Sequence, residues 1–222
     1  MLVQDYMTRH PLLVGPERRA VEAQQLLVAN KVSQLPVVGD GKRLLGLVTA
    51  AGLAVRPEQL ASMNVWELSA YLGQVTVGQV MTPAAQLPVV TPQDTLEDTA
   101  AALIGAGLRG LPVVEDGVVV GVITETDLLV ELRNLLGAID AGWRVVVRVP
   151  DRMGEFRKLV QLIAGHEWGI MAMGCVRSPK HPGHWDIVAK VRHCTREALL
   201  AALAELPDQV VVDIRETRGD KG

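Results

Sequence analysis

The chain has 222 residues, of which 49% are hydrophobic and only 3% aromatic, and its formal net charge is −3 at pH 7. This length predicts one to three modest domains with cores of Val, Leu, Ile and Ala, and the charge argues against a strongly basic nucleic-acid binder. No apolar run reaches the roughly 18 residues that a membrane-spanning helix needs, so we expect no membrane span.

Two further features bear on the compartment. The N-terminus has no basic flank followed by an apolar stretch, so it does not resemble a secretory signal. The two cysteines, Cys175 and Cys194, are too few for a disulfide framework, and we interpret them as reduced thiols packed as small hydrophobic residues. Both features favour a cytoplasmic protein.

The first 137 residues contain the same sequence pattern twice. Residues 34–49 contain Leu-Pro-Val-Val, a Gly-Asp-Gly turn and Leu-Gly-Leu-Val-Thr, and residues 110–124 contain Leu-Pro-Val-Val, Glu-Asp-Gly and Val-Gly-Val-Ile-Thr. Met7, Pro36 and Thr49 recur 74 to 76 residues later as Met81, Pro112 and Thr124. A chain that repeats a supersecondary unit usually folds the copies as a pseudo-symmetric pair with clefts between them.

The first repeat covers about residues 1–56. Its apolar and turn patterns predict a strand at 12–14, a helix at 17–30, a hairpin of strands at 35–38 and 44–49, and a helix beginning near residue 50. Residues 57–76 have no counterpart in the second repeat. Pro57 should end the preceding helix, and residues 65–72 predict a short amphipathic helix packed across the pair.

The second repeat covers about residues 77–137. We predict a strand at 87–90 and a helix that begins with Thr91 as N-cap, Pro92 at its first position and Asp94 at its third. Its apolar face comprises Leu96, Ala100, Leu103, Ile104 and Gly107. Strands at 111–114 and 118–123 follow, and a closing helix carries the apolar stripe Leu128, Leu129, Leu132 and Leu136.

The pattern changes after Gly137. Strands are predicted at 143–149, 169–177, 185–192 and 210–214, and helices at 154–166 and from Thr195. This βαββαβ order is typical of a ferredoxin-like sheet backed by two helices. The sequence thus predicts an α/β (α+β) chain of three domains, at residues 1–76, 77–140 and 143–217.

The repeat resembles the CBS domain. The resemblance rests on Leu-Pro-Val-Val and Gly-Val-Ile-Thr-Glu-Thr-Asp, and it covers about residues 1–137 as a tandem pair, or Bateman module. It implies a fold that binds adenosine-containing ligands such as AMP, ATP or S-adenosylmethionine between the repeats. It also implies a regulatory protein that forms a homodimer.

The family pattern assigns ligand-binding roles to particular residues. Thr124 would reach a phosphate or the ribose, and Asp127 would accept hydrogen bonds from both ribose hydroxyls. Thr124-x-x-Asp127 also fits a capping box at a helix start, and the two roles are compatible. The opposite wall would comprise Thr8, Leu12, Val32, Ser33, Gln34 and Pro36, with backbone groups at 32–34 facing the adenine.

The first repeat departs from this pattern at Gly52, which stands where the second repeat has Asp127. The second cleft would comprise Thr49 and, opposite, Thr82, Leu108, Arg109 and Gly110. Without a carboxylate it should bind adenosine poorly. Arg109 could still attract a phosphate, or it could be a solvated or salt-bridged arginine. We therefore expect one competent cleft and one degenerate cleft.

The C-terminal domain resembles the ACT domain, a regulatory unit that often binds amino acids where its first strand meets its first helix. Asp151 and Gly154 lie at that junction, and Met153 replaces the proline usual before the glycine. Gly154 would let a carboxylate approach backbone N–H groups, although a helix-start turn without ligand explains it equally. ACT domains also dimerise through their sheet edges.

The sequence carries no catalytic constellation. No P-loop, Rossmann fingerprint, HExxH or GxSxG occurs, and His193-Cys194 has no partner acid. His181 and His184 lack a third metal ligand and are interpreted as loop residues. The chain is therefore predicted to be a non-enzymatic sensor without a cofactor, relaying a nucleotide signal to the ACT-like domain or a protein partner. The alternatives are an amino-acid-responsive regulator and a purely structural dimerisation module.

Overall fold

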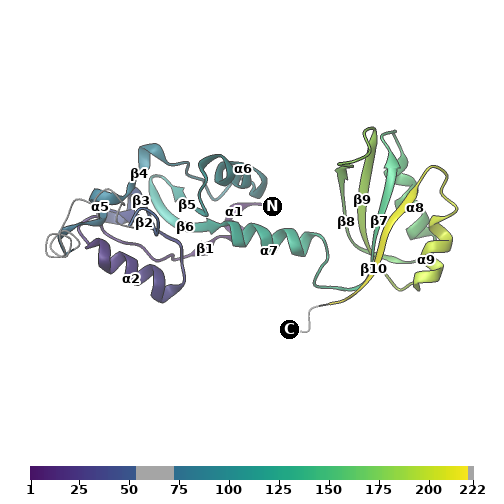
Figure 1. The fold of residues 1–222 in the computed structure, drawn as a ribbon, viewed down its shortest axis with the longest axis horizontal. Coiled ribbons are helices and arrows are strands. Elements are labelled where there is room, and N and C mark those ends of the chain that lie inside the picture. Colours follow the sequence, from purple (N-terminus) through teal and green to yellow (C-terminus); the bar gives the residue numbers. More distant parts are fainter. Residues whose placement is uncertain (54–72, 220–222) are drawn as a thin grey trace, which may run out of the picture. The chain divides into compact units, whose positions relative to one another are not determined.

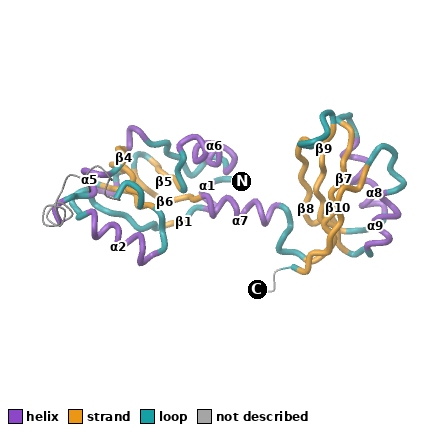
Figure 2. Tube along the Cα trace, in the orientation of Figure 1, coloured by secondary structure: helices purple, strands orange, loops and turns teal. Residues whose placement is uncertain are grey.

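The computed structural model describes residues 1–53 and 73–219 (Figures 1 and 2). The helix predicted at 65–72 and the break at Pro57 lie outside the described residues. The chain divides into two compact units, Met1–Leu128 and Leu129–Gly222. The three domain ranges given above stay predictions.

The first unit contains two three-stranded antiparallel sheets, one around each hairpin. Strands β2 (Gln34–Val38), β3 (Leu44–Thr49) and β4 (Thr82–Pro83) form one sheet in that order. Strands β1 (Thr8–Arg9), β6 (Val118–Thr124) and β5 (Gly110–Glu115) form the other. Both predicted hairpins are confirmed, and their registers correspond, since Gln34 pairs with Thr49 and Gly110 with Thr124.

Short and long helices accompany the sheets. They are α1 (Val3–Tyr6), α2 (Ala20–Asn30), α5 (Val77–Val80), α6 (Leu96–Ala106) and α7 (Glu125–Leu135), with 3-10 turns η1 (Asp40–Lys42) and η2 (Ala84–Gln86). One core gathers α2, β2 and β3 around Leu27, Leu35, Val37 and Val48. The other gathers α6, β5 and β6 around Leu103, Leu111, Val113 and Ile123.

The leading segments of the two repeats are exchanged. Strand β1 precedes the first hairpin but pairs with β6, and β4 precedes the second hairpin but pairs with β3. The helices follow, because Val3 of α1 lies in the second core and Val77 of α5 lies in the first. A Cβ at Gly46 would lie 2.5 Å from the Thr82 carbonyl oxygen, so only glycine lets the exchanged segment pass so closely.

The strands predicted at 12–14 and 87–90 are wrong. Val14 and Val90 each form a single parallel bridge, to β2 and β5 respectively. Pro16 and Pro92 follow two residues later, and a proline has no N–H with which to continue a ladder. Each segment is therefore extended chain fixed at one residue.

The helix predicted from Thr91 begins four residues later. The Thr91 N–H donates to Asp94 Oδ2 over 2.7 Å, which closes a turn, and Thr95 is the N-cap that accepts from the Asp98 N–H over 3.1 Å. Both Thr-x-x-Asp patterns fit a cap, but only the second places Leu96 in the core. The helix predicted at 17–30 likewise starts at Ala20.

Two predicted apolar faces are partly wrong. Leu96, Thr99 and Leu103 are the buried residues of α6, whereas Ile104 is 83% exposed. Helix α7 has no fully buried residue: Leu128 of the predicted stripe is half-buried and packs against the second core, whereas Leu129, Leu132 and Leu136 are exposed. Periodicity identified the helices but overestimated the width of the faces that the small sheets cover.

The second unit is a four-stranded antiparallel sheet with two helices on one face (Figure 1). Its elements are β7 (Ala141–Pro150), α8 (Glu155–Gly165), β8 (Gly169–Arg177), β9 (His184–Arg192), α9 (Arg196–Leu203) and β10 (Val210–Arg218). The strand order β10-β7-β9-β8 confirms the predicted ferredoxin-like order of elements. The assignment to the ACT family stays a prediction.

A buried amine lies on this sheet. Lys190 of β9 is 2% exposed, and its Nζ has no hydrogen-bond partner among the described residues. A Cβ at Gly137 would lie 3.3 Å from Lys190 Cγ, so the backbone there covers the side chain closely. Burial lowers the pKa of Lys190, and the charge of Asp140 only partly opposes this.

Lys190→Met should stabilise the protein, because an unsatisfied buried donor costs about 1–3 kcal/mol. The free energy of unfolding near neutral pH, measured by urea titration, should rise by that order. The folded-state pKa lies below the unfolded one, so the unfolded chain binds more protons and wild-type stability increases with pH in the interval between them. The variant should lose this dependence, whereas the exposed control Lys180→Met should keep it. A less stable Lys190→Met would contradict the prediction.

Candidate functional site

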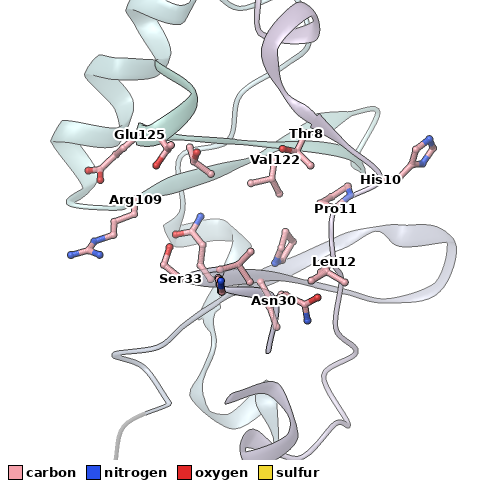
Figure 3. Close-up of a pocket in the computed structure, with 16 residues that line it drawn as sticks. Thr8, His10, Pro11, Leu12, Asn30, Ser33, Arg109, Val122 and Glu125 are labelled. Carbon is pink, nitrogen blue, oxygen red and sulfur yellow. The ribbon is translucent and has the colours of Figure 1, made fainter. Parts of the chain in front are cut away.

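The first unit contains a cavity of about 590 Å³, here called the first cavity (Figure 3). This volume lies in the usual range of small-molecule sites. Its walls come from both repeats: β1, β6 and the start of α7 on one side, and the segment around Leu12 with the end of α2 and the start of β2 on the other. Lining residues include Thr8, His10, Leu12, Asn30, Lys31, Val32, Ser33, Gln34, Pro36, Arg109, Val122, Thr124 and Glu125.

The structure brings together most of the residues predicted for the competent cleft. Seven of them line the first cavity, namely Thr8, Leu12, Val32, Ser33, Gln34, Pro36 and Thr124. Thr8 lies on the other wall from that predicted: it pairs with Val122, so it stands on the Thr124 side, and Figure 3 shows it facing Leu12. The exchange of leading segments is the reason.

Asp127 is not among the residues that line the first cavity, because it caps α7. Its Oδ2 accepts the Thr124 N–H over 2.8 Å and the Thr124 hydroxyl over 2.7 Å, and the Asp127 N–H donates to Thr124 Oγ1 over 3.3 Å. The capping box is therefore present. Oδ1 accepts no hydrogen bond from the described residues, which leaves two lone pairs for another partner.

Lys31 is a cavity residue that our sequence reasoning did not identify. It ends α2 in the left-handed conformation with φ 54°, and Gly107 does the same for α6 with φ 63°. Glycine is the unstrained choice at this position, whereas a lysine there costs about 1–2 kcal/mol. An alignment of the two repeats on their helix ends would have revealed this replacement.

The charges around the first cavity favour an anion. Lys31 and Arg109 are cationic, His10 is protonatable, and Glu125 is the acidic residue among the described lining residues. The Arg109 side chain makes no hydrogen bond or ion pair with any residue that the structure describes. Figure 3 shows Arg109 and Glu125 on the same wall, opposite Ser33. Such an excess of positive charge suits a phosphate-bearing ligand.

Gln34 holds an unused donor at the cavity. The residue is 7% exposed, and its Nε2 has no hydrogen-bond partner among the described residues. The amide fits against Gly110, its counterpart in the second repeat, where a Cβ would lie 2.7 Å from Nε2. A buried N–H group without an acceptor is rare in folded proteins, so the Gln34 amide is a candidate ligand contact.

A second cavity of about 380 Å³ lies on the Thr49 side. Of the residues predicted for the degenerate cleft, Thr49, Leu108 and Arg109 line it, but Thr82 and Gly110 do not. Thr82 pairs with Leu47 in the sheet, and the Gln34 amide lies against Gly110. The complete described lining is Ser33, Gln34, Thr49, Ala50, Ala51, Gly107, Leu108 and Arg109.

The second cavity has a backbone cap at Thr49 like the one at Thr124, but it lacks a counterpart of the Asp127 carboxylate. The Gly52 N–H donates to Thr49 Oγ1 over 3.1 Å, which matches the bond from Asp127 to Thr124. Gly52 offers no side chain, and none of the described lining residues is acidic. Arg109 is the charged residue among them. This wall can therefore donate hydrogen bonds to an anion but cannot accept the two ribose hydroxyls on a carboxylate.

A third cavity of about 190 Å³ lies where β7 meets α8. Asp151 lines it as predicted, but Gly154 does not; Gly154 has φ 90°, so the turn itself requires glycine. Glu155 is 3% exposed and accepts from Lys158 Nζ over 2.8 Å, which holds the pKa of that carboxyl below its usual range. Two acids beside one arginine, Arg152, do not favour a ligand carboxylate here.

No metal centre is visible in the described part of the chain, where no three His, Cys, Asp or Glu side chains gather suitably. His181 instead lies 3.1 Å from the Arg148 guanidinium, measured from its Nε2. Within the same residues, no helix is long and apolar enough to cross a membrane.

Comparison with known proteins defines the class. The family model of the CBS domain matches residues 3–54 and 77–134. The CBS domain-containing protein YhcV of Bacillus subtilis is 30% identical over 128 residues, which cover 58% of this chain and 83% of YhcV. The chain therefore belongs to the CBS-domain family and carries the domain as a tandem pair.

Two solved structures share the fold of the pair. A Vibrio cholerae protein described as an acetoin utilization protein (AcuB) is 31% identical, with a TM-score of 0.51 over 62% of this chain and 93% of that one. CBSX2 of Arabidopsis thaliana, solved in complex with AMP, is 30% identical, with a TM-score of 0.51 over 60% of this chain and 97% of the solved CBSX2 chain.

Other relatives are longer than the matched region. The inosine-5'-monophosphate dehydrogenase of Korarchaeum cryptofilum is 35% identical over 83 residues, which are 37% of this chain but only 16% of the enzyme. The chloroplastic protein CBSX1 of Arabidopsis thaliana is 33% identical over 150 residues, 57% of this chain and 62% of CBSX1. The chain thus spans under two thirds of either relative.

Asp127→Ala should lower the free energy of unfolding by about 1 kcal/mol, the usual effect of losing a helix cap. Asp127→Asn should lower it less, because the amide oxygen can still accept the Thr124 N–H. Denaturant titration without ligand measures both. Glu125→Ala is the control, because Glu125 lies two residues before Asp127 in the same helix and its side chain makes no hydrogen bond with the described residues. Equal stability of Asp127→Ala and wild type would show that the cap contributes nothing.

Lys31→Gly should leave stability unchanged or raise it by up to about 1 kcal/mol, since relief of the left-handed strain outweighs the greater freedom of glycine in the unfolded chain. The same variant should bind an anionic ligand more weakly. Thermal unfolding measures the first effect and titration calorimetry with AMP the second. A destabilised Lys31→Gly with unchanged binding would refute a role for Lys31 in the cavity.

Proposed function

We propose that this chain is a non-enzymatic regulatory protein whose CBS pair binds an adenosine-containing ligand, of the AMP, ATP or S-adenosylmethionine type, in the first cavity. The first cavity carries this proposal, because it combines a suitable volume, the Thr124–Asp127 cap and two cations, Lys31 and Arg109. The AMP complex of CBSX2, whose solved chain is 30% identical and covered to 97% by this chain, supports it.

Each part of such a ligand has a chemically matched wall. Asp127 Oδ1 keeps two acceptor sites, which suit the two hydroxyls of a ribose. The apolar side chains of Leu12, Val32 and Pro36 suit the adenine ring, with backbone groups of residues 32–34 at its edge. Lys31 and Arg109 suit a phosphate.

The ligand would act through differential affinity for two arrangements of the repeats, which is the only way binding shifts a conformational equilibrium. The signal would pass to the ferredoxin-like domain or to a protein partner. We further propose a cytoplasmic homodimer. The resemblance to AcuB of Vibrio cholerae supports a regulatory role but identifies neither acetoin nor its pathway for this chain.

An amino-acid-responsive regulator is the second candidate, favoured by the third cavity at the predicted ACT site. Asp151 and the buried Glu155 would attract the amino group of such a ligand more than its carboxylate. Asp151→Asn is a better test than any Gly154 variant, because a side chain at Gly154 would strain the backbone at φ 90°. The third candidate, a structural dimerisation module, predicts no stabilisation by any small molecule.

AMP should raise the melting temperature of the wild-type protein, because a ligand that binds only the native state stabilises it by about 2.7 kcal/mol at roughly 100 times its Kd. A thermal-shift screen of AMP, ADP, ATP, S-adenosylmethionine, NAD and amino acids identifies the chemical class of the ligand. Asp127→Asn should then weaken binding about tenfold or more, since it removes a charged acceptor but keeps the cap.

Glu125→Gln is the matched control, as it neutralises the acid that lines the first cavity beside Asp127. If Glu125→Gln weakens binding and Asp127→Asn does not, Glu125 is the ribose acceptor and our assignment of Asp127 is wrong. Stabilisation by amino acids alone, lost in Asp151→Asn, would favour the second candidate. A protein that no ligand stabilises would favour the structural one.

A further inference from the structure

The first and second cavities share part of their lining, here called the shared wall, to which the first repeat contributes Ser33 and Gln34 and the second repeat contributes Arg109. Ser33 and Arg109 occupy corresponding positions in the two repeats. Each directly precedes the first residue of its hairpin, which is Gln34 in the first repeat and Gly110 in the second. The two cavities therefore adjoin at these three residues, so a ligand that fills one cavity lies beside the lining of the other.

Two hydrogen-bond donors on this wall are unused. Gln34 Nε2 is buried without an acceptor, and the Arg109 guanidinium has no partner among the described residues. Both are donors only at these atoms, and a phosphate oxygen is an acceptor only. An arginine beside an unpaired amide N–H therefore matches a phosphate group better than it matches a sugar or a base.

The second cavity is suited to receive phosphates but not a second nucleoside. Its described lining contains Arg109 and no carboxylate, and Gly52 replaces the acid that would hold a ribose. Its size, about 380 Å³, leaves room for several phosphate groups. The first cavity, in contrast, is lined by the carboxylate of Glu125 and by Thr124, whose hydroxyl bonds to the Asp127 carboxylate in the helix cap.

We propose that the two cavities form one site for a nucleoside polyphosphate. The nucleoside lies in the first cavity, and the phosphate chain runs past Gln34 and Arg109 into the second. This inference rests on the proposed function and adds to it a selection for ATP over AMP. It also gives the buried Gln34 amide a hydrogen-bond partner.

Titration calorimetry with AMP and with ATP, both without divalent metal ions, tests the inference through the ratio of the two Kd values. Wild type should bind one molecule of either nucleotide and bind ATP about tenfold or more tightly than AMP, the gain expected from charged hydrogen bonds. Gln34→Leu should bring the ratio close to one. Its melting temperature without ligand should not fall, because the change removes an unsatisfied donor.

A charge placed in the second cavity gives a test that leaves the shared wall intact. Ala51 lines the second cavity and not the first, and Ala51→Asp should weaken ATP binding while leaving AMP binding unchanged, because the carboxylate repels only the longer phosphate chain. Ala51→Asn has almost the same size without the charge, and it should keep the preference for ATP.

Three results separate failure of this inference from failure of the proposed function. If AMP and ATP bind equally and Gln34→Leu changes nothing, the polyphosphate subsite is wrong but the adenosine site stands. If wild type binds two AMP molecules with similar affinity, the second cavity is an independent nucleoside site and the inference is overturned. If no nucleotide binds wild type, the proposed function falls and this inference falls with it.

Discussion

The exchange of leading segments is the constraint on which the rest of the first unit depends. Neither repeat completes its own sheet, because β1 pairs with β6 and β4 with β3. The close approach admits no side chain at Gly46, and at Gly121 a Cβ would lie 2.5 Å from Met7 Sδ and displace that side chain. The exchange ties the folding of each core to the other. It also builds the first cavity, since β1 brings Thr8 beside Val122 and the chain then continues to Leu12 on the other wall.

The repeats differ most where they meet the cavities. Lys31 ends its helix where the second repeat has Gly107, and Gln34 begins its hairpin where the second repeat has Gly110. Gly52 of the first repeat corresponds to Asp127 of the second. The first two differences reduce stability, through left-handed strain and an unsatisfied donor. Both unfavourable residues line the first cavity. Strain of this kind is commonly found at functional sites.

Local pattern predicted the hairpins and the ferredoxin-like order well, because alternation and turn residues act within a few positions. It could not show that Thr8 would pair with Val122, since that contact depends on the docking of one repeat against the other. It also could not choose between Thr91 and Thr95 as helix cap, because the choice is made by burial of Leu96. The sequence does not reveal that the Gln34 amide is unpaired, because a glutamine at the surface forms hydrogen bonds with water and the sequence does not show which glutamines are buried. Lys31 was detectable by comparing helix ends.

Asp127 has one carboxylate oxygen for each of the two roles that the sequence suggests, the helix cap and the acceptor for a ligand. One carboxylate oxygen holds the start of α7 through Thr124, and the other is free of the described residues. A ligand that hydrogen-bonds only to Oδ1 leaves the cap intact and adds a second restraint on the same side chain, so it should tighten the first turn of the helix. A ligand that competes for Oδ2 would release the Thr124 N–H and loosen that turn. The sign of the response at α7 therefore depends on which oxygen the ligand engages, and the geometry favours tightening.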